Sequence, residues 1–408
     1  MLFFSMAWRN VWRNRRRSLL TVMAIGLGLA FNIFLRGVTD GWHDEMIDNS
    51  VRAEIGHIQI HRAGYHEEPS INKTLPDPPE VERAIRGLPN LLGYSFRVIG
   101  SGLASTAENS TGVEILGVDP AQERTVTTVQ RVIVSGQYLS SGVGRPVLIG
   151  ELLARRLKAS LGDKLVLVVQ AADGSMGAQL FRVTGIFRSG SPELDGGIVY
   201  ILRSDAQDLF WLGDRVTEAV VLLRSAREVP GAVTALQRNL RRDDAEILPW
   251  WIVEPFIKQL IQLDDAFFYV IALIFFVVIS IGILNTLMMS IFERTREFGV
   301  MMALGTKPGQ IVRLVLEEAF GLGLVGLGVG CALGSAATLF FAKEGINLAS
   351  VKAGAAVTGI TSSVVYTELT QVNLIYSSIA VLVVVLVVAL YPAARASRLK
   401  PIHAIRYV

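Results

Sequence analysis

The sequence predicts a membrane protein: four transmembrane α-helices with a large mixed α/β extracytoplasmic domain between the first and the second. Of its 408 residues 51% are hydrophobic, which is more than a soluble chain of this length needs for its core. The apolar residues gather in four runs long enough to span a bilayer, and the region between the first two runs alternates short β-like stretches with turns. The expected order is an amphipathic segment (1–17), transmembrane helix 1 (18–37), the external α/β domain (38–251), a stalk with transmembrane helix 2 (252–291), a coupling segment (292–313), transmembrane helix 3 (314–341), a short external loop (342–371), transmembrane helix 4 (372–391) and a tail (392–408).

Charge is divided unevenly along the chain, and this division predicts the orientation in the membrane. From Asp40 to Asp265 there are 30 acidic and 23 basic residues, a net charge of −7. Basic clusters lie before the first span, between the second and third spans, and after the last span. By the positive-inside rule these three regions, and therefore both termini, are cytoplasmic. A nucleic-acid patch is disfavoured because each cluster adjoins a hydrophobic run, and the single cysteine, Cys331, excludes an internal disulfide framework.

The N-terminal segment carries aromatic and aliphatic residues at helical spacing beside Arg9 and Arg13, which predicts an amphipathic helix in the membrane interface. The following apolar run, Ser18 to Leu35, would reach about 27 Å, just enough to cross the hydrocarbon core. A cleaved signal peptide is the alternative, but no small-x-small cleavage site follows the run. We therefore expect an uncleaved anchor.

The external domain is predicted to contain eight strands and four helices. Asp173 and Gly174 lie in a turn between two of the expected strands and indicate a hairpin. Sequence alone does not order the strands into a sheet. The expected strands are 55–60, 96–101, 112–118, 147–150, 164–170, 179–187, 197–201 and 218–223, and the expected helices are 79–86, 151–159, 204–211 and 230–241.

A stalk is predicted before the second span. Phe256, Ile257, Leu260 and Ile261 recur on one helical face and lead into the apolar run that ends at Ile291. A single helix over 252–291 would be on the order of 60 Å long, about twice the hydrocarbon thickness, so its first part would stand outside the membrane. Two helices broken at Asp264 and Asp265 are the alternative, but no Gly or Pro lies there.

The bend after the second span has the pattern of a short interfacial helix. Glu293 and Glu297 are four residues apart, as are Met301 and Gly305, so we expect a helix that closes at Gly305 before Pro308 starts the third span.

Three glycines mark one face of the third span. Gly326, Gly330 and Gly334 recur at intervals of four, which lets another backbone approach closely. We expect this face to pack against a helix of the same subunit rather than to form a dimer seam. Pro392 is expected to close the fourth span.

Motifs for catalysis or cofactor binding are absent from the sequence. No G-x-x-x-x-G-K-[ST] occurs, so this chain cannot cradle nucleotide phosphates in a P-loop. His57 and His61 would stand about 13 Å apart in a strand, too far to bind one metal ion. No histidine pairs with a serine by motif. We expect a non-catalytic chain that binds no cofactor or metal.

The run ILNTLMMSIFERTREFGVMMALGTKPGQIVRLVLEEAFGLGLVGLGVG resembles the coupling segment of the MacB/LolC/FtsX permeases, the mechanotransmission (type VII) class of ABC transporters. The segments AWRNVWRNRRRSLLTVMAIGLG, GHIQIHRAGYHE, VLIGELLARRLKASLGDKL and PAARASRLKPIHAIRY agree in the same order, so the resemblance covers essentially the whole chain. It implies a cytoplasmic ABC ATPase dimer that binds ATP and Mg, and a second permease copy or paralogue. It also implies contact with the ATPase through Glu293, Arg294, Arg296, Glu297, Gly299, Met301, Ala303, Leu304 and Gly305.

The layout resembles most the lipoprotein-releasing LolC/LolE group of the bacterial inner membrane. This implies extraction of lipoproteins from the outer leaflet and delivery to a periplasmic carrier. The apolar runs of the spans, 18–35, 266–291, 314–341 and 372–391, support this reading because they hold no Lys, Arg or Asp. A lipid-anchored substrate needs only a lateral apolar opening, expected between the first two spans. The alternatives are MacB-like efflux with a periplasmic adaptor and FtsX-like signalling to a cell-wall hydrolase; the size of the external domain counts against the last.

Overall fold

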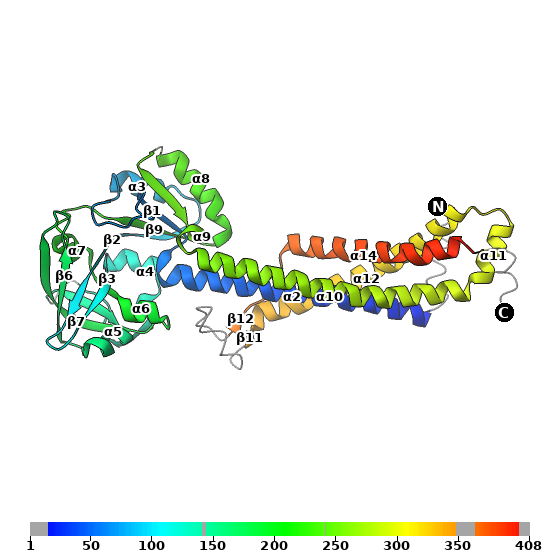
Figure 1. The fold of residues 1–408 in the computed structure, drawn as a ribbon, viewed down its shortest axis with the longest axis horizontal. Coiled ribbons are helices and arrows are strands. Elements are labelled where there is room, and N and C mark those ends of the chain that lie inside the picture. Colours follow the sequence, from blue (N-terminus) through cyan, green and yellow to red (C-terminus); the bar gives the residue numbers. More distant parts are fainter. Residues whose placement is uncertain (1–14, 141–143, 241, 348–363, 400–408) are drawn as a thin grey trace. The chain divides into compact units, whose positions relative to one another are not determined.

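The computed structural model describes residues 15–140, 144–240, 242–347 and 364–399 (Figure 1). The described chain forms two compact units. One unit is helical and contains residues 15–43, 261–347 and 364–399; the other is an α/β unit of residues 44–260. Most of the predicted amphipathic segment 1–17 lies outside the described residues.

The described part of the helical unit consists of long apolar helices with the shorter helix α11 and two short strands. Among the described residues, four helices are long and apolar enough to cross a membrane. We call the end of the bundle at which α2 and α10 continue into the α/β unit the domain end. We call the opposite end, around α11, the bend end. The elements are α2 (Arg15–Ser50), α10 (Pro255–Glu293), α11 (Thr295–Ala303), α12 (Pro308–Glu344), the short strands β11 (Ile346–Asn347) and β12 (Val364–Val365), and α14 (Gln371–Ser397).

Helix α2 is much longer than the predicted first span. It continues past residue 37 to Ser50 and ends in a π-helical turn, Val51–Ile55, so the strand expected from Ile55 begins only at Ile58. No proline interrupts residues 38–55. The helix stops at Gly56, whose φ of +68° favours glycine and whose N–H donates to Val51 O. A Cβ there would overlap the side chain of Val220.

Helix α10 begins later than the predicted stalk. Ile252 belongs to a separate short helix, α9 (Trp250–Val253), and α10 starts at Pro255. A proline lacks an N–H and disfavours helical geometry in the residue before it, so Glu254 separates the two helices. From Pro255 onward the helix runs without a break through Asp264 and Asp265, as expected.

The prediction that Pro392 closes the last span is wrong. Pro392 lies inside α14, which continues to Ser397. A proline removes one N–H from the helix, and membrane helices tolerate this where neighbouring helices support the backbone. Pro392 is buried, and the adjacent Ala393 and Ala396 pack in the cluster of apolar residues at the bend end.

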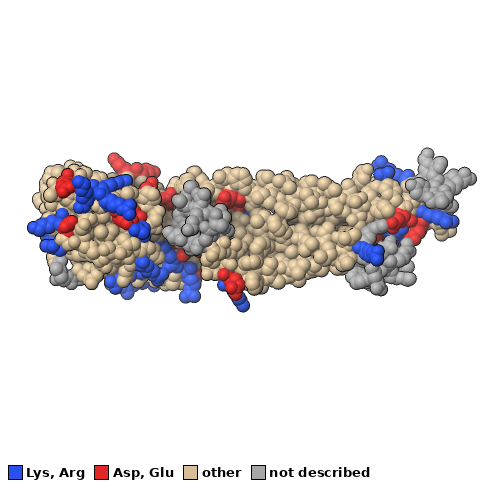
Figure 2. Space-filling model, turned by 90° about the horizontal axis from the view of Figure 1, so that it is seen from below, with Lys and Arg blue, Asp and Glu red and all other residues tan. Residues whose placement is uncertain are grey.

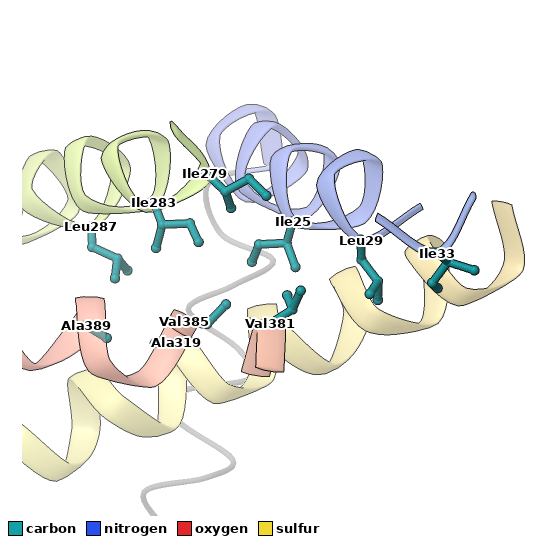
Figure 3. Close-up of a cluster of buried hydrophobic side chains, with 10 residues drawn as sticks. All are labelled: Ile25, Leu29, Ile33, Ile279, Ile283, Leu287, Ala319, Val381, Val385 and Ala389. Atoms are coloured by element: carbon teal, nitrogen blue, oxygen red, sulfur yellow. The ribbon is translucent and has the colours of Figure 1, made fainter. Parts of the chain in front are cut away.

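The centre of the bundle is apolar and receives side chains from all four helices (Figure 3). Figure 2 shows a corresponding band of uncharged surface along the helices, with charged side chains gathered at the bend end. The lateral opening expected between the first two spans is absent from the described structure. Gly28 of α2 lies against Ile279 of α10, and the rings of Phe31 and Phe275 are 4.4 Å apart. The buried side chains of the cluster are Ile25, Leu29, Ile33, Ile279, Ile283, Leu287, Ala319, Val381, Val385 and Ala389.

The three spaced glycines of α12 face α2 of the same chain. A Cβ on Gly330 would lie 2.7 Å from Leu29 Cβ and 2.9 Å from Gly26 O. A Cβ on Gly334 would lie 3.0 Å from the Cα of Ala30, and one on Gly326 would meet Ile25. The backbones of α2 and α12 therefore approach each other closely. In lipid such close approach stabilises helix pairs through van der Waals packing.

The α/β unit is built on one ten-stranded mixed sheet, with the order β10-β1-β9-β2-β3-β8-β5-β7-β4 and with β6 pairing with β2 and β7. Strands β5 and β9 are buried along their whole length, as their unbroken apolar runs suggest. The strands are β1 (Ile58–Arg62), β2 (Leu91–Ser105), β3 (Ser110–Val118), β4 (Ile133–Gly136), β5 (Pro146–Gly150), β6 (Lys164–Gln170), β7 (Met176–Phe187), β8 (Ile198–Leu202), β9 (Glu218–Leu223) and β10 (Ala245–Pro249).

Short helices and turns connect the strands. Helices α4 and α6, and strands β4 and β10, were not predicted. Each of the two helices starts with a capping residue followed by proline: Asp119 accepts from the N–H groups of Ala121 and Gln122, and Ser191 accepts from that of Leu194. The helices are α3 (Pro78–Arg86), α4 (Pro120–Val126), α5 (Glu151–Leu157), α6 (Pro192–Gly197), α7 (Arg203–Leu209) and α8 (Val229–Leu240), with 3-10 turns at Val129–Val132 and Ala226–Glu228.

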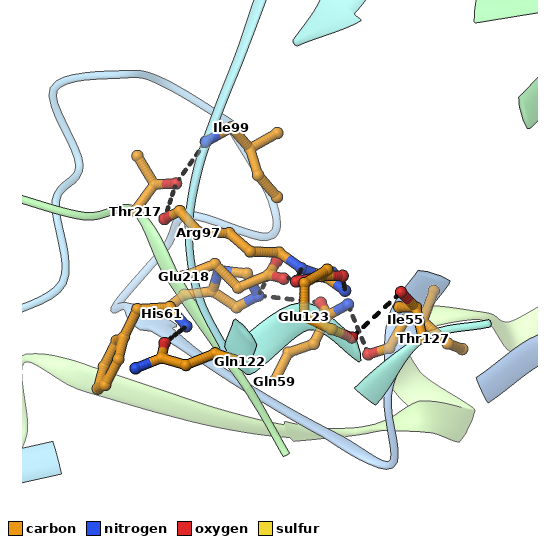
Figure 4. Close-up of polar contacts among 11 residues, drawn as sticks. Ile55, Gln59, His61, Arg97, Ile99, Gln122, Glu123, Thr127, Thr217 and Glu218 are labelled. Atoms are coloured by element: carbon orange, nitrogen blue, oxygen red, sulfur yellow. Dashed lines mark hydrogen bonds and ion pairs between the residues drawn. The ribbon is translucent and has the colours of Figure 1, made fainter. Parts of the chain in front are cut away.

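A buried ionic network holds β2, β9 and α4 together (Figure 4). Arg97 is 1% exposed; its Nη2 is 2.6 Å from Glu123 Oε1 and its Nη1 is 3.1 Å from Glu218 Oε1. Such a network fixes strand and helix positions because an unpaired buried charge is costly.

His57 and His61, the two histidines considered as metal ligands, are buried. Burial lowers the pKa of His57 to about 4, and Leu223 N–H donates to its Nδ1. Burial also lowers the pKa of His61 to about 4, and its Nε2 lies 3.0 Å from Gln59 Oε1. Both rings are therefore neutral parts of the packed interior.

Candidate functional site: the bend between α10 and α12

The bend is a compact helical turn whose boundaries follow from its sequence. Helix α10 ends at Glu293, α11 spans Thr295–Ala303, and α12 starts at Pro308. Gly305 has φ of +96°, a conformation that favours glycine, and so reverses the chain after α11. Pro308 occupies the first turn of α12, and the side chain of Gln310 accepts from Lys307 N–H.

Arg294 braces the bend from within. Its Nε is 2.9 Å from Glu297 Oε2 on α11, and its Nη1 is 2.7 Å from Glu318 Oε2 on α12. Its guanidinium also lies 5.1 Å from the ring centroid of Phe298. The side chains of Arg294 and Glu318 are only 10% and 12% exposed. Because a buried charge that loses its partner costs about 3–5 kcal/mol, this contact fixes α11 relative to α12.

The apolar side of α11 packs on the ends of the neighbouring helices. Phe298 is 1% exposed, and Gly299 beside it is buried. Met301 and Met302 are partly buried against the same cluster. The cluster consists of Ile291, Phe298, Ile311, Leu314, Val315, Ala393 and Ala396, which come from α10, α11, α12 and α14.

The opposite side of α11 is exposed. Leu304 is 83% exposed and Val300 is 44% exposed. Arg296 and Glu297 are exposed beside them, so charged and apolar groups alternate on a surface one helix wide. The resemblance to the permease family implies contact with an ATPase at this bend, and this is the side of α11 that is exposed and available for it. We call Arg296, Glu297, Val300, Ala303, Leu304 and Gly305 the docking face.

The structure thus divides the coupling residues named from the sequence into two groups. Arg294, Gly299 and Met301 face inward and position α11, whereas the docking face, with Glu293, is exposed. The partner of Arg294, Glu318, was missed as part of the site, although a carboxylate about three turns into the apolar helix α12 was a signal. The sequence did not show which acidic residue lies near Arg294, because the contact spans 24 positions.

The predicted stalk residues lie in the first turns of α10. Phe256 is 55% exposed, and Ile257, Leu260 and Ile261 are half-buried. Phe256 therefore does not share the burial of the other three, although its helical spacing agrees with theirs.

Comparisons with known proteins agree with this architecture. Residues 18–239, more than half of the chain, match the model of the MacB-like periplasmic core domain, and residues 269–401 match the FtsX-like permease C-terminal model.

Curated relatives cover nearly the whole chain. The lipoprotein-releasing system transmembrane protein LolC of Neisseria meningitidis is 21% identical over 96% of this chain and 94% of its own length. LolE of Haemophilus influenzae, of the same system, is 23% identical over 98% of this chain and 97% of its own length. The macrolide export ATP-binding/permease protein MacB of Nitrobacter winogradskyi is 25% identical over 96% of this chain but only 58% of its own length. The chain is thus a multi-pass bacterial membrane protein and belongs to the LolC/MacB/FtsX family of ABC transporter permeases.

Proposed function

We propose that this chain couples ATP hydrolysis by a separate ABC ATPase dimer to the release of lipoproteins from the outer leaflet of the bacterial inner membrane. The observation that carries the proposal is the apolar interior of the bundle. Ile25, Ile283 and Val385, from three different helices, meet at the centre and are at most 1% exposed. A hydrophilic solute gains no polar route along such a core, whereas a substrate anchored by acyl chains needs none.

The α/β unit supports the proposal because one face of its sheet is apolar and exposed. Leu103 of β2 pairs in register with Val168 of β6, and Leu180 of β7 pairs with Val166. Leu103 and Leu180 are each 50% exposed, and Met176 is 72% exposed. Moving acyl chains out of lipid costs about 0.8 kcal/mol per CH₂ without apolar cover. This sheet face, exposed on the α/β unit, offers such cover to the chains or to a carrier that takes them.

The docking face of α11 is the surface for the ATPase. Its exposed leucine and valine would enter an apolar groove, and Arg296 and Glu297 would set the orientation. Arg294, braced by Glu318, would carry the displacement into α12. In this orientation the basic residues near the bend and both termini lie in the cytoplasm.

The docking role is tested by co-purification of the ATPase with Leu304→Asp. Leu161→Asp is the matched control because Leu161 is also exposed, at 42%, but lies in the α/β unit. We expect the ATPase to be lost from the Leu304 variant only. Equal recovery of the ATPase with both variants would remove α11 from the interface.

The substrate role is tested with Leu180→Asp in vesicles that contain the complex, a triacylated lipoprotein and a soluble carrier. We expect lower release per ATP than with Leu161→Asp, while the ATPase remains bound. The MacB relative, a macrolide export protein by name, gives the second candidate, which is export; the family resemblance implies that a periplasmic adaptor takes part in it. Vesicles that hydrolyse ATP but release no lipoprotein, and expel a soluble compound when an adaptor is added, would favour that function.

A further inference from the structure

Polar groups tie α2 to α10 at the domain end of the bundle. Arg36 of α2 lies between two carboxylates: its Nη1 is 2.6 Å from Asp265 Oδ1 on α10, and its Nε is 2.9 Å from Asp40 Oδ1 one turn along α2. The same guanidinium lies 5.1 Å from the ring centroid of Phe268. Its side chain is 19% exposed, so water screens these contacts only in part.

The same carboxylate attaches α14. Asn373, in the first turn of α14, donates a hydrogen bond from Nδ2 to Asp40 Oδ2. Asp40 thus accepts from Arg36 with one oxygen and from Asn373 with the other. Arg36 and Asp40, both on α2, therefore join this helix to α10 and to α14.

A backbone strap joins α2 to α12. The strap, residues 366–368, crosses α2 where two glycines leave room: Glu368 N–H donates to Gly37 O at 2.9 Å, and a Cβ on Gly41 would overlap Tyr366 O. Thr367 Oγ1 donates to Thr338 O of α12 at 2.6 Å. We call the whole set the clasp: Arg36, Gly37, Asp40, Gly41, Asp265, Thr338, Tyr366, Thr367, Glu368 and Asn373.

The clasp differs in kind from the contacts at the middle of the bundle. There the helices meet through aliphatic side chains such as Leu29, Ile283 and Val385. In lipid such side chains lose little when they exchange one apolar neighbour for another, so outside the close glycine contact between α2 and α12 the helices can shift past one another. The clasp instead consists of directional hydrogen bonds and ion pairs, which lose their partners when the helices move.

We propose that the clasp is a fixed pivot, so that displacement of α11 tilts the bend ends of the helices while their domain ends keep their mutual positions. The inference rests on the coupling role proposed above. A fixed pivot turns a movement at α11 into rotation of α2 and α10, the two helices that continue into the α/β unit. Without it, the same movement would be absorbed by sliding between helices.

Spin-label distances test the pivot directly in the full chain with its ATPase. With Cys331 replaced by alanine, one label pair spans the clasp, at Leu263 of α10 and Val372 of α14, which are 52% and 55% exposed. The second pair spans the same helices near the bend, at Met289 and Leu390, each 50% exposed. Labelled chains are diluted with unlabelled chains so that each measured distance lies within one subunit.

We expect a non-hydrolysable ATP analogue to change the bend-end distance by roughly 2–5 Å and to leave the clasp distance unchanged. A clasp distance that changes as much as the bend-end distance would overturn the pivot and leave the coupling role intact. A bend-end distance that does not respond to nucleotide would contradict the coupling role, and the pivot with it. In Gly41→Ala the clasp distance should become nucleotide-dependent, whereas it should stay fixed in Gly282→Ala, where a Cβ meets nothing within 4 Å.

A reversible cross-link separates a fixed pivot from a latch that must open. Asp40→Cys with Asn373→Cys, in the background without Cys331, removes the contact between α2 and α14, and a short bis-methanethiosulfonate restores it covalently. We expect lipoprotein release per ATP to fall about fivefold or more in the unlinked protein, to recover on linking and to fall again with reductant. Loss of release on linking, or full release without the link, would overturn the pivot.

Discussion

Replacing Gly330 by alanine should separate α2 from α12. A Cβ at this position would lie 2.7 Å from Leu29 Cβ and 2.9 Å from Gly26 O, closer than packed atoms approach. Neither atom is the free end of a side chain, so the two helices must move apart. Overpacking of this kind costs about 1–3 kcal/mol. Alanine also favours the helix over glycine by about 1 kcal/mol, which partly offsets the cost.

Gly328→Ala is the control variant, because it gains the same helix propensity as Gly330→Ala without the overpacking. Gly328 lies in the same helix, and a Cβ there meets nothing within 4 Å. Both substitutions gain the same propensity, so the difference between the variants reports the overpacking alone. We expect Gly330→Ala to be less stable than Gly328→Ala by about 1–3 kcal/mol. Unfolding of the full chain by SDS in mixed micelles, followed by circular dichroism, measures this difference. Equal stabilities would show that Gly330 does not lie against α2.

Three further outcomes are expected. The pKa of His57 is about 4 in the folded chain and 6.5 for an ordinary histidine, so its contribution to stability is complete above pH 6.5 and is lost as the pH falls towards 4. At pH 5 the loss of stability is roughly 2 kcal/mol. The variant His57→Asn keeps a hydrogen-bond acceptor but does not titrate, so denaturant unfolding should show a smaller loss of stability in acid for this variant than for the parent. Equal acid losses would refute this. Glu318→Gln leaves Arg294 with one carboxylate, so it should lower stimulated ATP hydrolysis while a pull-down still recovers the ATPase; undiminished stimulation would contradict the brace. In a cysteine-free background, a membrane-impermeant maleimide should label a cysteine at Asp173 and not one at Thr306, and the reverse pattern would invert the topology.

The sequence predicted best the features that depend on local pattern. Strand 164–170 and strand 218–223 appear with the expected bounds, because alternation or an unbroken apolar run is enough to define them. The helix at the bend was also recognisable, since Gly305 and Pro308 act on their immediate neighbours. Helix α4 also has a local signal, because Asp119 followed by Pro120 is a typical capping pair at a helix start.

Features set by tertiary contact could not be predicted from pattern. Helix α2 continues through polar residues beyond the span, where Asp40 and Arg36 find partners on other helices. Pro392 is accommodated within α14 because it packs at the buried end of the bundle. Arg294 turns inward because Glu318, far along the chain, lies within reach. In each case a distant partner outweighs the local preference.

Lipoprotein release by the reconstituted complex is the decisive measurement for the proposed function. Vesicles containing the permease, its ATPase and a triacylated lipoprotein are incubated with a soluble carrier, and lipoprotein in the supernatant is measured against ATP hydrolysed. We expect release that requires ATP and disappears with Leu304→Asp but not with Leu161→Asp. Sustained ATP hydrolysis with every lipoprotein retained in the vesicles would contradict it.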